Sequence, residues 1–261
     1  MELRNYGMPT LIELSDIEEC AKLCSELGLD FIELNMNMPQ YQIDKIDVEQ
    51  FKRIAESHNI YYTLHLDENL NVSDFNPYIA NAYTKTVIKT IEIAKQLGVN
   101  VLNMHLSKGV YFTMPNKKVF LLSEYKDLYH KSIVAFREAC NYAIGDSDIK
   151  ICIENCNGYE DFQKEAIELL LESKVFGLTF DVGHNHSIGD ADEEFIMKHK
   201  KHLRHMHLHD TLSKKCHLAL GTGGTDIKKH IAIANEQNCR IVLETKTING
   251  LRESVKWLRE H

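Results

Sequence analysis

One pattern recurs along the chain: an amphipathic helical stretch, a turn that ends it, and a short apolar run of β-forming residues. In "IEECAKLCSELGLDFIEL", apolar residues recur at helical spacing and stop at Gly28, which precedes a short apolar run. "VIKTIEIAKQLGVNVLNMH" repeats this order with Gly98 as the stop, and four other stretches follow it as well. The pattern predicts strands at 3–6, 31–34, 60–66, 99–105, 149–154, 176–181, 203–209 and 240–244.

Eight strands that alternate with helices predict a parallel (β/α)8 TIM barrel, for which about 250 residues is the usual size. The chain has 261 residues, so we expect a single α/β domain of this kind over 1–261. An open, doubly wound sheet is the alternative, but no GxGxxG follows the first predicted strand. The stretch "GTGGTD" at 221–226 lacks that spacing and is expected to shape a loop before a helix at 225–237.

Composition narrows the class of protein. Hydrophobic residues make up 44% and charged residues 26% of the chain, which is an ordinary globular balance. The net charge of −8 gives no basic footprint for nucleic acid. Seven cysteines without a CxxC pair are typical of free thiols in a reducing cytosol. No signal-peptide core and no apolar run of membrane-spanning length are seen, so a cytoplasmic protein is expected.

The C-terminal ends of the predicted strands carry an unusual set of side chains. In a (β/α)8 barrel these ends and the loops after them form the active face. One such histidine or acid alone is more often a core or surface residue. Here, however, six successive strands carry one at the same height, so all would point into one cavity. The six are His65, His105, Glu154, Asp181, His207 and Glu244.

Carboxylates brought so close would repel one another, and their burial would be costly without a counter-charge. A divalent cation removes this penalty, and mixed imidazole and carboxylate ligands suit zinc or manganese. The stretch "LRHMHLHD" places three histidines at alternate positions, on one face of a strand. We expect His207 to be the ligand and the deeper His205 to orient a ligand. His209 and Asp210 are expected at the rim.

The chain resembles the xylose-isomerase-like barrel superfamily, which includes sugar isomerases and epimerases and the endonuclease IV type of apurinic-site nuclease. The resemblance runs from "FIELN" to the last helix and rests on phrases that follow in order, about one per strand. These phrases are "TLHL", "NMH", "CIEN", "FDVGH", "HMHLHD", "HLALGTG" and "VLET". The resemblance implies a barrel with a divalent metal at its C-terminal mouth.

The two branches imply different ligand sets. In the isomerase and epimerase branch a single metal would be held by Glu154, Asp181, His207 and Glu244. The nuclease branch holds three zinc ions, the first of which would use His65, His105 and Glu154. Its third site would need His184, His217 and an aspartate at position 215, where this chain has Lys215. The loop "NYGMPTLIEL" also lacks the histidine and glycine motif of that branch, so DNA cleavage is not expected.

From these residues we expect a metal-dependent isomerase or epimerase of a small sugar or sugar derivative, without a nucleic-acid or membrane partner. Glu154 and Glu244 would transfer a proton through a cis-enediolate. A metal-dependent phosphoester hydrolase is the alternative, and a barrel that binds without turnover is a third class. The oligomeric state is not readable, and a homo-oligomer stays open. The expected substrate-binding residues are His184, His217, Lys246 and Lys215, with loop aromatics Tyr78, Tyr111 and Phe112 either packing on a sugar ring or covering the barrel.

Overall fold

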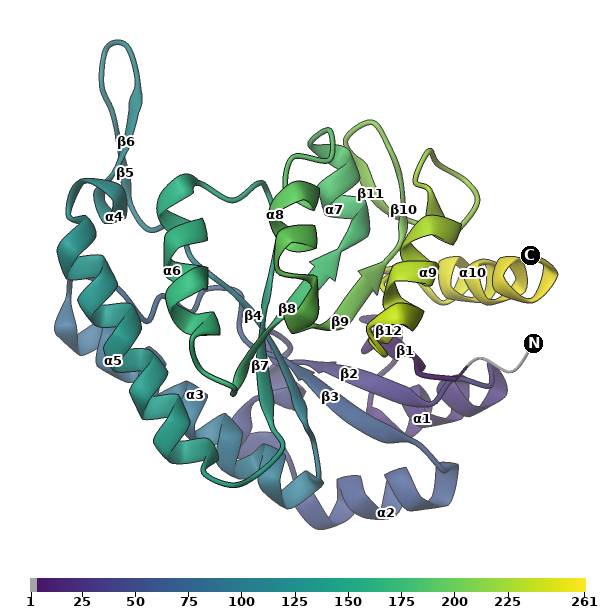
Figure 1. The fold of residues 1–261 in the computed structure, drawn as a ribbon. Helices are drawn as coiled ribbons and strands as arrows, with labels where there is room; N and C mark the ends of the chain where they lie inside the picture. Colours follow the sequence, from purple (N-terminus) through teal and green to yellow (C-terminus); the bar gives the residue numbers. More distant parts are fainter. Residues whose placement is uncertain (1–3) are drawn as a thin grey trace.

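The computed structural model describes residues 4–261, and its central feature is a closed barrel of eight parallel strands (Figure 1). Around the barrel the strands follow the order β1, β2, β3, β4, β7, β8, β9 and β12, so each is hydrogen-bonded to the next barrel strand in the chain. Their bounds are β1 Tyr6–Pro9, β2 Phe31–Asn35, β3 Tyr61–His65, β4 Val101–His105, β7 Lys150–Glu154, β8 Phe176–Asp181, β9 Leu203–Leu208 and β12 Arg240–Leu243.

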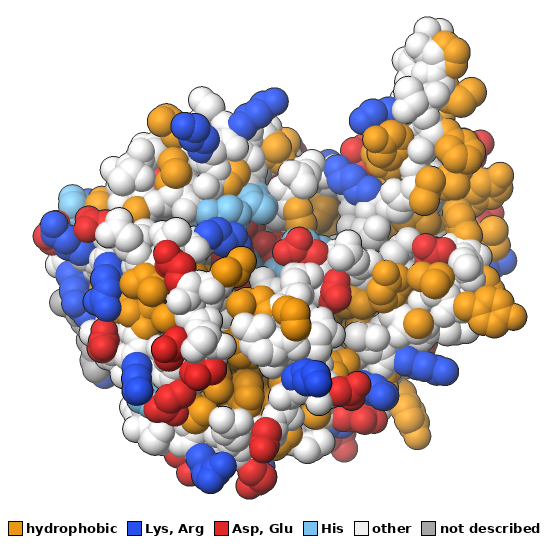
Figure 2. Space-filling view, turned by 180° about the vertical axis from the view of Figure 1, so that it is seen from behind, with side chains coloured by type: hydrophobic (Ala, Val, Ile, Leu, Met, Phe, Trp, Pro, Cys, Tyr) orange, Lys and Arg blue, Asp and Glu red, His pale blue; other side chains and the backbone are white. Residues whose placement is uncertain are grey.

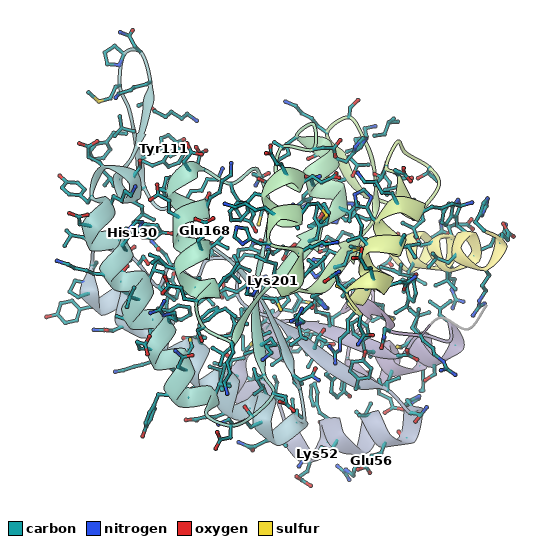
Figure 3. All side chains as sticks on the ribbon, in the orientation of Figure 1. Lys52, Glu56, Tyr111, His130, Glu168 and Lys201 are labelled. Carbon is teal, nitrogen blue, oxygen red and sulfur yellow. The ribbon has the colours of Figure 1, made fainter. Side chains whose placement is uncertain are left out.

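Helices cover the outside of this barrel. The α-helices are α1 Ile17–Glu26, α2 Val48–His58, α3 Pro77–Leu97, α4 Leu121–Glu124, α5 Lys126–Ile144, α6 Asp161–Leu171, α7 Val182–Ser187, α8 Glu193–Lys198, α9 Ile227–Glu236 and α10 Ile248–Glu260. Short 3-10 turns occupy Pro39–Tyr41, Ile43–Lys45 and Lys200–His202. Polar side chains of the outer helices, such as Lys52 and Glu56 on α2, point away from the barrel (Figure 3). Among residues 4–261, no helix is both long and apolar enough to cross a membrane.

Local sequence signals set the ends of these helices. Asp16 and Asp47 accept a hydrogen bond from the backbone of the first turn of α1 and α2, and Thr247 does so for α10. Gly98 ends α3 with a left-handed φ of 71°, which a residue without a Cβ adopts at little cost. The aspartates and the threonine thus mark where helices begin, and Gly98 marks where α3 ends before the chain enters β4.

The strands are buried on both faces, as expected for a parallel barrel covered by helices. Ile151 and Ile153 on β7 and Leu178 and Phe180 on β8 are fully buried. Such side chains join one continuous apolar core that extends to the inner faces of the helices. This rigid support fixes the height at which each strand ends.

The register of the strands brings polar residues of neighbouring strands side by side. His105 on β4 pairs with Glu154 on β7, and Asp181 on β8 pairs with His207 on β9. Deeper in the barrel, Glu33 on β2 pairs with Thr63 on β3. The register therefore gathers imidazoles and carboxylates at the C-terminal mouth before any loop is considered.

The structure corrects two sequence expectations about secondary structure. The first strand was predicted at 3–6, but it begins at Tyr6, because Asn5 has a left-handed φ of 64° that interrupts an extended chain; residue 3 lies outside the described residues. The long stretch after β4, where no strand was predicted, contains an antiparallel hairpin of β5 Tyr111–Thr113 and β6 Lys118–Phe120. A second hairpin, β10 Asp210–Leu212 and β11 Lys215–Leu218, follows β9.

Candidate active site

The mouth of the barrel holds two groups of potential metal ligands that share Glu154. In the first group, Glu154 Oε2 lies 3.0 Å from His105 Nε2 and 3.4 Å from His65 Nε2. Asn103 also donates a hydrogen bond to this oxygen. The His65 Nδ1 is 2.8 Å from the Leu66 carbonyl, so Nδ1–H donates there. Burial lowers the pKa of His65, but Glu154 outweighs it and raises that pKa to about 9, so Nε2–H faces the carboxylate in the metal-free protein.

The second group is formed by Glu154, Asp181, His207 and Glu244. His207 Nδ1 lies 3.0 Å from Glu154 Oε1, 3.3 Å from Glu244 Oε2 and 4.0 Å from Asp181 Oδ2. One ligand atom from each of the four residues lies within 4.8 Å of all the others. The structure thus brings together all six residues that the strand-end argument selected, in two sets that meet at one carboxylate.

Two carboxylate oxygens of the second group are buried without a hydrogen-bond donor among residues 4–261: Asp181 Oδ2 and Glu244 Oε2. Three carboxyl groups of this group surround one imidazole, and all four residues are buried. An unpaired buried charge costs several kcal/mol, on the order expected for an ion removed from water. The donor set therefore fits a divalent cation, with mixed oxygen and nitrogen ligands of the kind that zinc and manganese accept.

The ionisation of these groups follows from their mutual contacts. Burial lowers the pKa of His207, but Glu154, Glu33 and Glu244 outweigh it and raise that pKa well above the ordinary value. Burial raises the pKa of Glu154 and Glu244, yet His207 holds both well below their usual range. In the metal-free protein a proton on His207 therefore supplies part of the positive charge that the carboxylates require.

Sequence reasoning missed Glu33, which lies below the mouth on β2. Its Oε1 is 2.7 Å from His207 Nε2, and its Oε2 is 2.8 Å from His205 Nε2 and accepts a hydrogen bond from Thr63 Oγ1 at 3.1 Å. Glu33 is thus held between two histidines of the β9 row, and it faces the His207 nitrogen opposite the one in the ligand group. The sequence offered one signal for the role of Glu33: it is an acidic residue inside the predicted strand at 31–34.

This contact yields a testable prediction. Glu33→Gln is expected to weaken zinc or manganese binding by about 10- to 100-fold, because the carboxylate orients the His207 ring and raises its basicity. Isothermal titration calorimetry of the metal-free protein would measure the change. Glu49→Gln on the surface of α2 is the matched control, since its side chain is largely exposed. Equal metal affinities for the two variants would exclude this role of Glu33.

The structure corrects the expectation that His209 and Asp210 lie at the rim. Both are buried, because the β10–β11 hairpin folds over the end of β9. Asp210 accepts hydrogen bonds from the backbone N–H groups of Thr211, Gly223 and Thr225, so it fixes the glycine-containing loop before α9.

His209 supports Asp181, and with His184 and His217 it also forms a third group of possible metal ligands. The His217 backbone N–H donates to His209 Nδ1 at 2.8 Å, so Nδ1 carries a lone pair and Nε2 carries the proton. That Nε2 lies 3.1 Å from Asp181 Oδ1, which also accepts the His184 backbone N–H. Asp181 is therefore held through Oδ1 and leaves Oδ2 for the ligand group.

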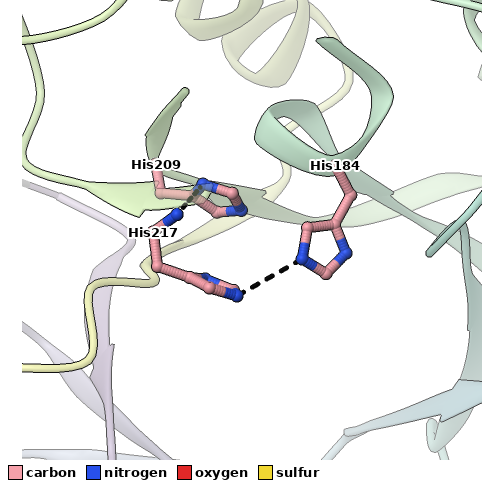
Figure 4. Close-up of side chains that lie close together, drawn as sticks. All are labelled: His184, His209 and His217. Atoms are coloured by element: carbon pink, nitrogen blue, oxygen red, sulfur yellow. Dashed lines mark hydrogen bonds between the residues drawn. The ribbon is translucent and has the colours of Figure 1, made fainter. Parts of the chain in front are cut away.

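His184 and His217 face each other above this level, with 3.3 Å between their Nε2 atoms (Figure 4). His217 Nδ1 lies 3.1 Å from the Glu244 carbonyl, where its N–H donates. Burial is the main cause that lowers the pKa of His217 to about 4, and this ring is therefore neutral at pH 7. Two polar imidazoles thus border the central group, where we predicted substrate contacts.

The two predicted lysines differ in position. Lys246 Nζ bonds Glu244 Oε1 at 2.8 Å, and this lysine is among the groups that lower the pKa of His217. Lys215 is exposed on β11. The structure gives it no ion pair within residues 4–261. Its role in binding substrate stays a prediction.

Two cavities border the ligand groups. One, of about 570 Å³, is lined by residues that include Thr10, Asn35, Glu68 and Lys246. The other, of about 230 Å³, is lined by Glu68, His105 and Glu154 among others, so the two cavities share Glu68. Histidine and acidic side chains are visible in the hollow on this face (Figure 2). Apolar walls with a few polar groups, such as Asn35, Glu68 and Lys246, are typical of sites that bind small molecules.

Fold and site together define a (β/α)8 barrel with a buried carboxylate and imidazole centre at its C-terminal mouth. The profile of the family described as "Xylose isomerase-like TIM barrel" matches residues 21–261. The chain belongs to this family of xylose isomerase-like TIM barrels. The sequence resemblance to this superfamily and the predicted single barrel are thereby confirmed.

Similar proteins share the fold at low sequence identity. The uncharacterized protein MJ1188 of Methanocaldococcus jannaschii is 21% identical over 215 residues, which cover 79% of this chain and 74% of the relative. A D-tagatose 3-epimerase-like protein has a crystal structure with a TM-score of 0.79, at 20% identity and with 98% and 96% of the two chains covered. The 3-keto-D-glucoside 4-epimerase YcjR from E. coli has a TM-score of 0.79 at 15% identity, covering 98% and 99%. The IolI protein, solved with a zinc atom, has a TM-score of 0.74 at 16% identity, covering 98% and 96%.

Proposed function

We propose that this protein is a divalent-metal-dependent epimerase or isomerase of a small sugar or sugar derivative. The observation that carries the proposal is the group of Glu154, Asp181, His207 and Glu244, whose ligand atoms converge in a buried site. Glu154 is the last residue of β7 and Glu244 directly follows β12, and these two strands are separated by β8 and β9 around the barrel. Two carboxylates can therefore reach a bound substrate from different sides.

These four residues would hold the cation, with zinc or manganese as the candidates. A bound divalent cation would polarise the substrate carbonyl and make the adjacent C–H more acidic. The zinc atom named for the IolI structure and the epimerases among the similar structures support this assignment. The convergence of four residues from four different strands favours a built site over a chance acidic cluster.

The side chains of this protein would carry out the proton transfer. One glutamate takes the proton from the carbon next to the carbonyl, and the electron pair left behind forms an enediolate. The same or the other glutamate returns a proton to that carbon or to its neighbour, which gives an epimer or an isomer. We assign the first transfer to Glu244, because Glu154 belongs to both ligand groups and also accepts a hydrogen bond from Asn103, whereas Glu244 belongs to the central group alone.

Exchange with solvent deuterium tests this proposal without knowledge of the product. The protein is incubated in deuterium oxide with manganese or zinc and a panel of ketoses that includes tagatose and allulose, and proton NMR follows loss of the C–H signal. We expect exchange at a carbon next to the carbonyl for at least one sugar, and its loss after removal of metal with a chelator. No exchange on any ketose of the panel would contradict the proposal.

A hydrolase of phosphoesters is a second candidate because His65, His105 and Glu154 form an additional group of possible ligands. Two adjacent cations would be needed to activate water and stabilise the leaving oxygen. The direct test is nicking of duplex DNA that contains an apurinic site, with zinc present. We expect no cleavage above the metal-only control, and cleavage that His65→Asn abolishes would favour the hydrolase.

The proposed metal site also predicts a dependence on pH. The carboxylates raise the pKa of His207, so its imidazole holds a proton at pH 7, and a cation that binds Nδ1 must displace it. Metal binding should therefore release protons, and metal affinity should increase as the pH rises toward that raised pKa. Calorimetric titrations in buffers with different ionisation enthalpies measure the protons released. An affinity that is unchanged between pH 6 and pH 8 would contradict this competition.

A further inference from the structure

A hairpin arm, formed by residues 110–120, projects from the barrel between β4 and α5 (Figure 1). Its strands pair only with each other, with Tyr111 opposite Phe120, Phe112 opposite Val119 and Thr113 opposite Lys118. All three residues of β5 are exposed. An isolated two-stranded hairpin is marginally stable in water, so an arm of this kind gains from packing against another surface.

The two faces of the arm differ. Tyr111 and Phe120 share one face, where their rings are 5.7 Å apart and Phe120 packs on Phe162 of α6. Tyr111 is labelled on the arm in Figure 3. Alternation along the strands places Phe112 and Val119 on the opposite face. The neighbouring Val110 and Met114 follow the same alternation, and Val110, Phe112 and Met114 are all exposed, Phe112 by 57%.

An apolar hollow lies on the same side of the molecule, between α3 and α5. It measures about 540 Å³, and its lining includes Val72, Phe75, Pro77, Leu128 and Phe136. Asp74 is the one charged residue among those that line it. The hollow is therefore lined mainly by apolar side chains and carries a single negative charge.

Exposed apolar side chains concentrate on the arm and around this hollow. Of 12 large hydrophobic residues that are exposed within residues 4–261, nine lie here: Phe75, Tyr78, Ile79, Val110, Tyr111, Phe112, Met114, Tyr125 and Leu128. Figure 2 shows apolar side chains along the arm and on the face beneath it. A contiguous exposed apolar surface of this kind marks an interaction site. Tyr78, Tyr111 and Phe112 therefore extend this surface instead of covering the barrel.

We propose that this face is the interface of a homodimer, in which the arm of each copy inserts Phe112 and Met114 into the α3–α5 hollow of the other. One chain carries both the projection and the hollow, which is the self-complementarity that a two-fold interface requires. Their charges are also complementary. Lys117 is the cross-strand neighbour of Met114 on the inserting face, whereas Lys118 lies over the Tyr111 ring on the other face, and Asp74 is the charge in the hollow. This inference is independent of the proposed catalytic function.

The primary test is sedimentation equilibrium of the full chain. We expect the native protein to sediment as a dimer of the 30.1 kDa chain at micromolar concentration. Phe112→Ser should raise the dimer dissociation constant at least about tenfold, because an aromatic anchor in a pocket carries much of the energy of an interface. The matched control is Leu212→Ser on β10, since Leu212 is also exposed by 57% but lies outside this face. Circular dichroism verifies that each variant is folded.

Charge reversal tests the identity of the partner surface. Asp74→Lys should weaken the dimer, and so should Lys117→Glu. Combining the two changes in one chain should restore the dimer, because each arm would again meet an opposite charge in its partner. A native protein that stays monomeric at about 100 µM would overturn the proposal and leave this face to another partner. A dimer equally affected by Phe112→Ser and Leu212→Ser would also overturn it.

Discussion

Glu244→Gln is expected to lower kcat by about 10²- to 10⁴-fold on any substrate that the exchange experiment identifies, because it removes the group assigned to proton transfer. The amide keeps the size of the side chain but cannot take a proton from carbon. The substitution also removes one of the three carboxylates of the central ligand group. Glu154→Gln is expected to cause a loss of similar size, since Glu154 contacts His105 and His207 and belongs to both ligand groups.

Metal content must be measured alongside the rate, at saturating manganese or zinc, to separate lost metal from lost proton transfer. Glu49→Gln, on the surface of α2, again serves as the control and should retain the native rate. If Glu244→Gln binds metal normally and turns over at a near-native rate, Glu244 is not part of the mechanism. The same criterion applies to Glu154.

Gly183→Ala is expected to destabilise the protein by about 1–3 kcal/mol, the usual cost of overpacking a core. A Cβ at position 183 would lie 2.0 Å from the Cε1 of His209, and His209 is fully buried. The ring has little freedom to move, because its Nδ1 accepts the His217 N–H and its Nε2 contacts Asp181. Displacing His209 would shift Asp181, so metal affinity should fall together with stability.

Urea unfolding of the metal-free protein measures the first effect and calorimetric metal titration the second. Gly224→Ala is the matched control, since Gly224 is exposed and its added Cβ would come no closer than 3.3 Å to His186. Native stability and native metal affinity in Gly183→Ala would show that the site tolerates movement of His209. In that case the support that we assign to His209 would be wrong.

The barrel was predictable because its information is local and repeated. Helical spacing, a stop such as Gly98 and an apolar run recur along the chain, and that repetition is typical of one fold. Strand ends share a height in such a fold, which is why residues as distant as His65 and Glu244 could be grouped before the structure was known. Their convergence follows from barrel closure.

What could not be predicted depends on contacts between distant segments. Glu33 stands out in its strand as an acid, but its partners His205 and His207 are 172 and 174 residues away. His209 seemed to be at the rim because nothing in its strand indicates that β10 and β11 fold over it. For the arm a local signal existed, since the β-forming runs "YFT" and "KVF" flank a turn sequence that contains Pro115 and Asn116.

Anomalous scattering from crystals grown with manganese or zinc tests the central claim most directly, because it locates and counts the bound ions. The account predicts one strong peak among Glu154, Asp181, His207 and Glu244. It also predicts no peak shared by His184 and His217, whose Nε2 atoms face each other at 3.3 Å. An empty central group would contradict the proposed metal site. Two or three ions spread over His65, His105, His184 and His217 would instead favour the hydrolase over the epimerase.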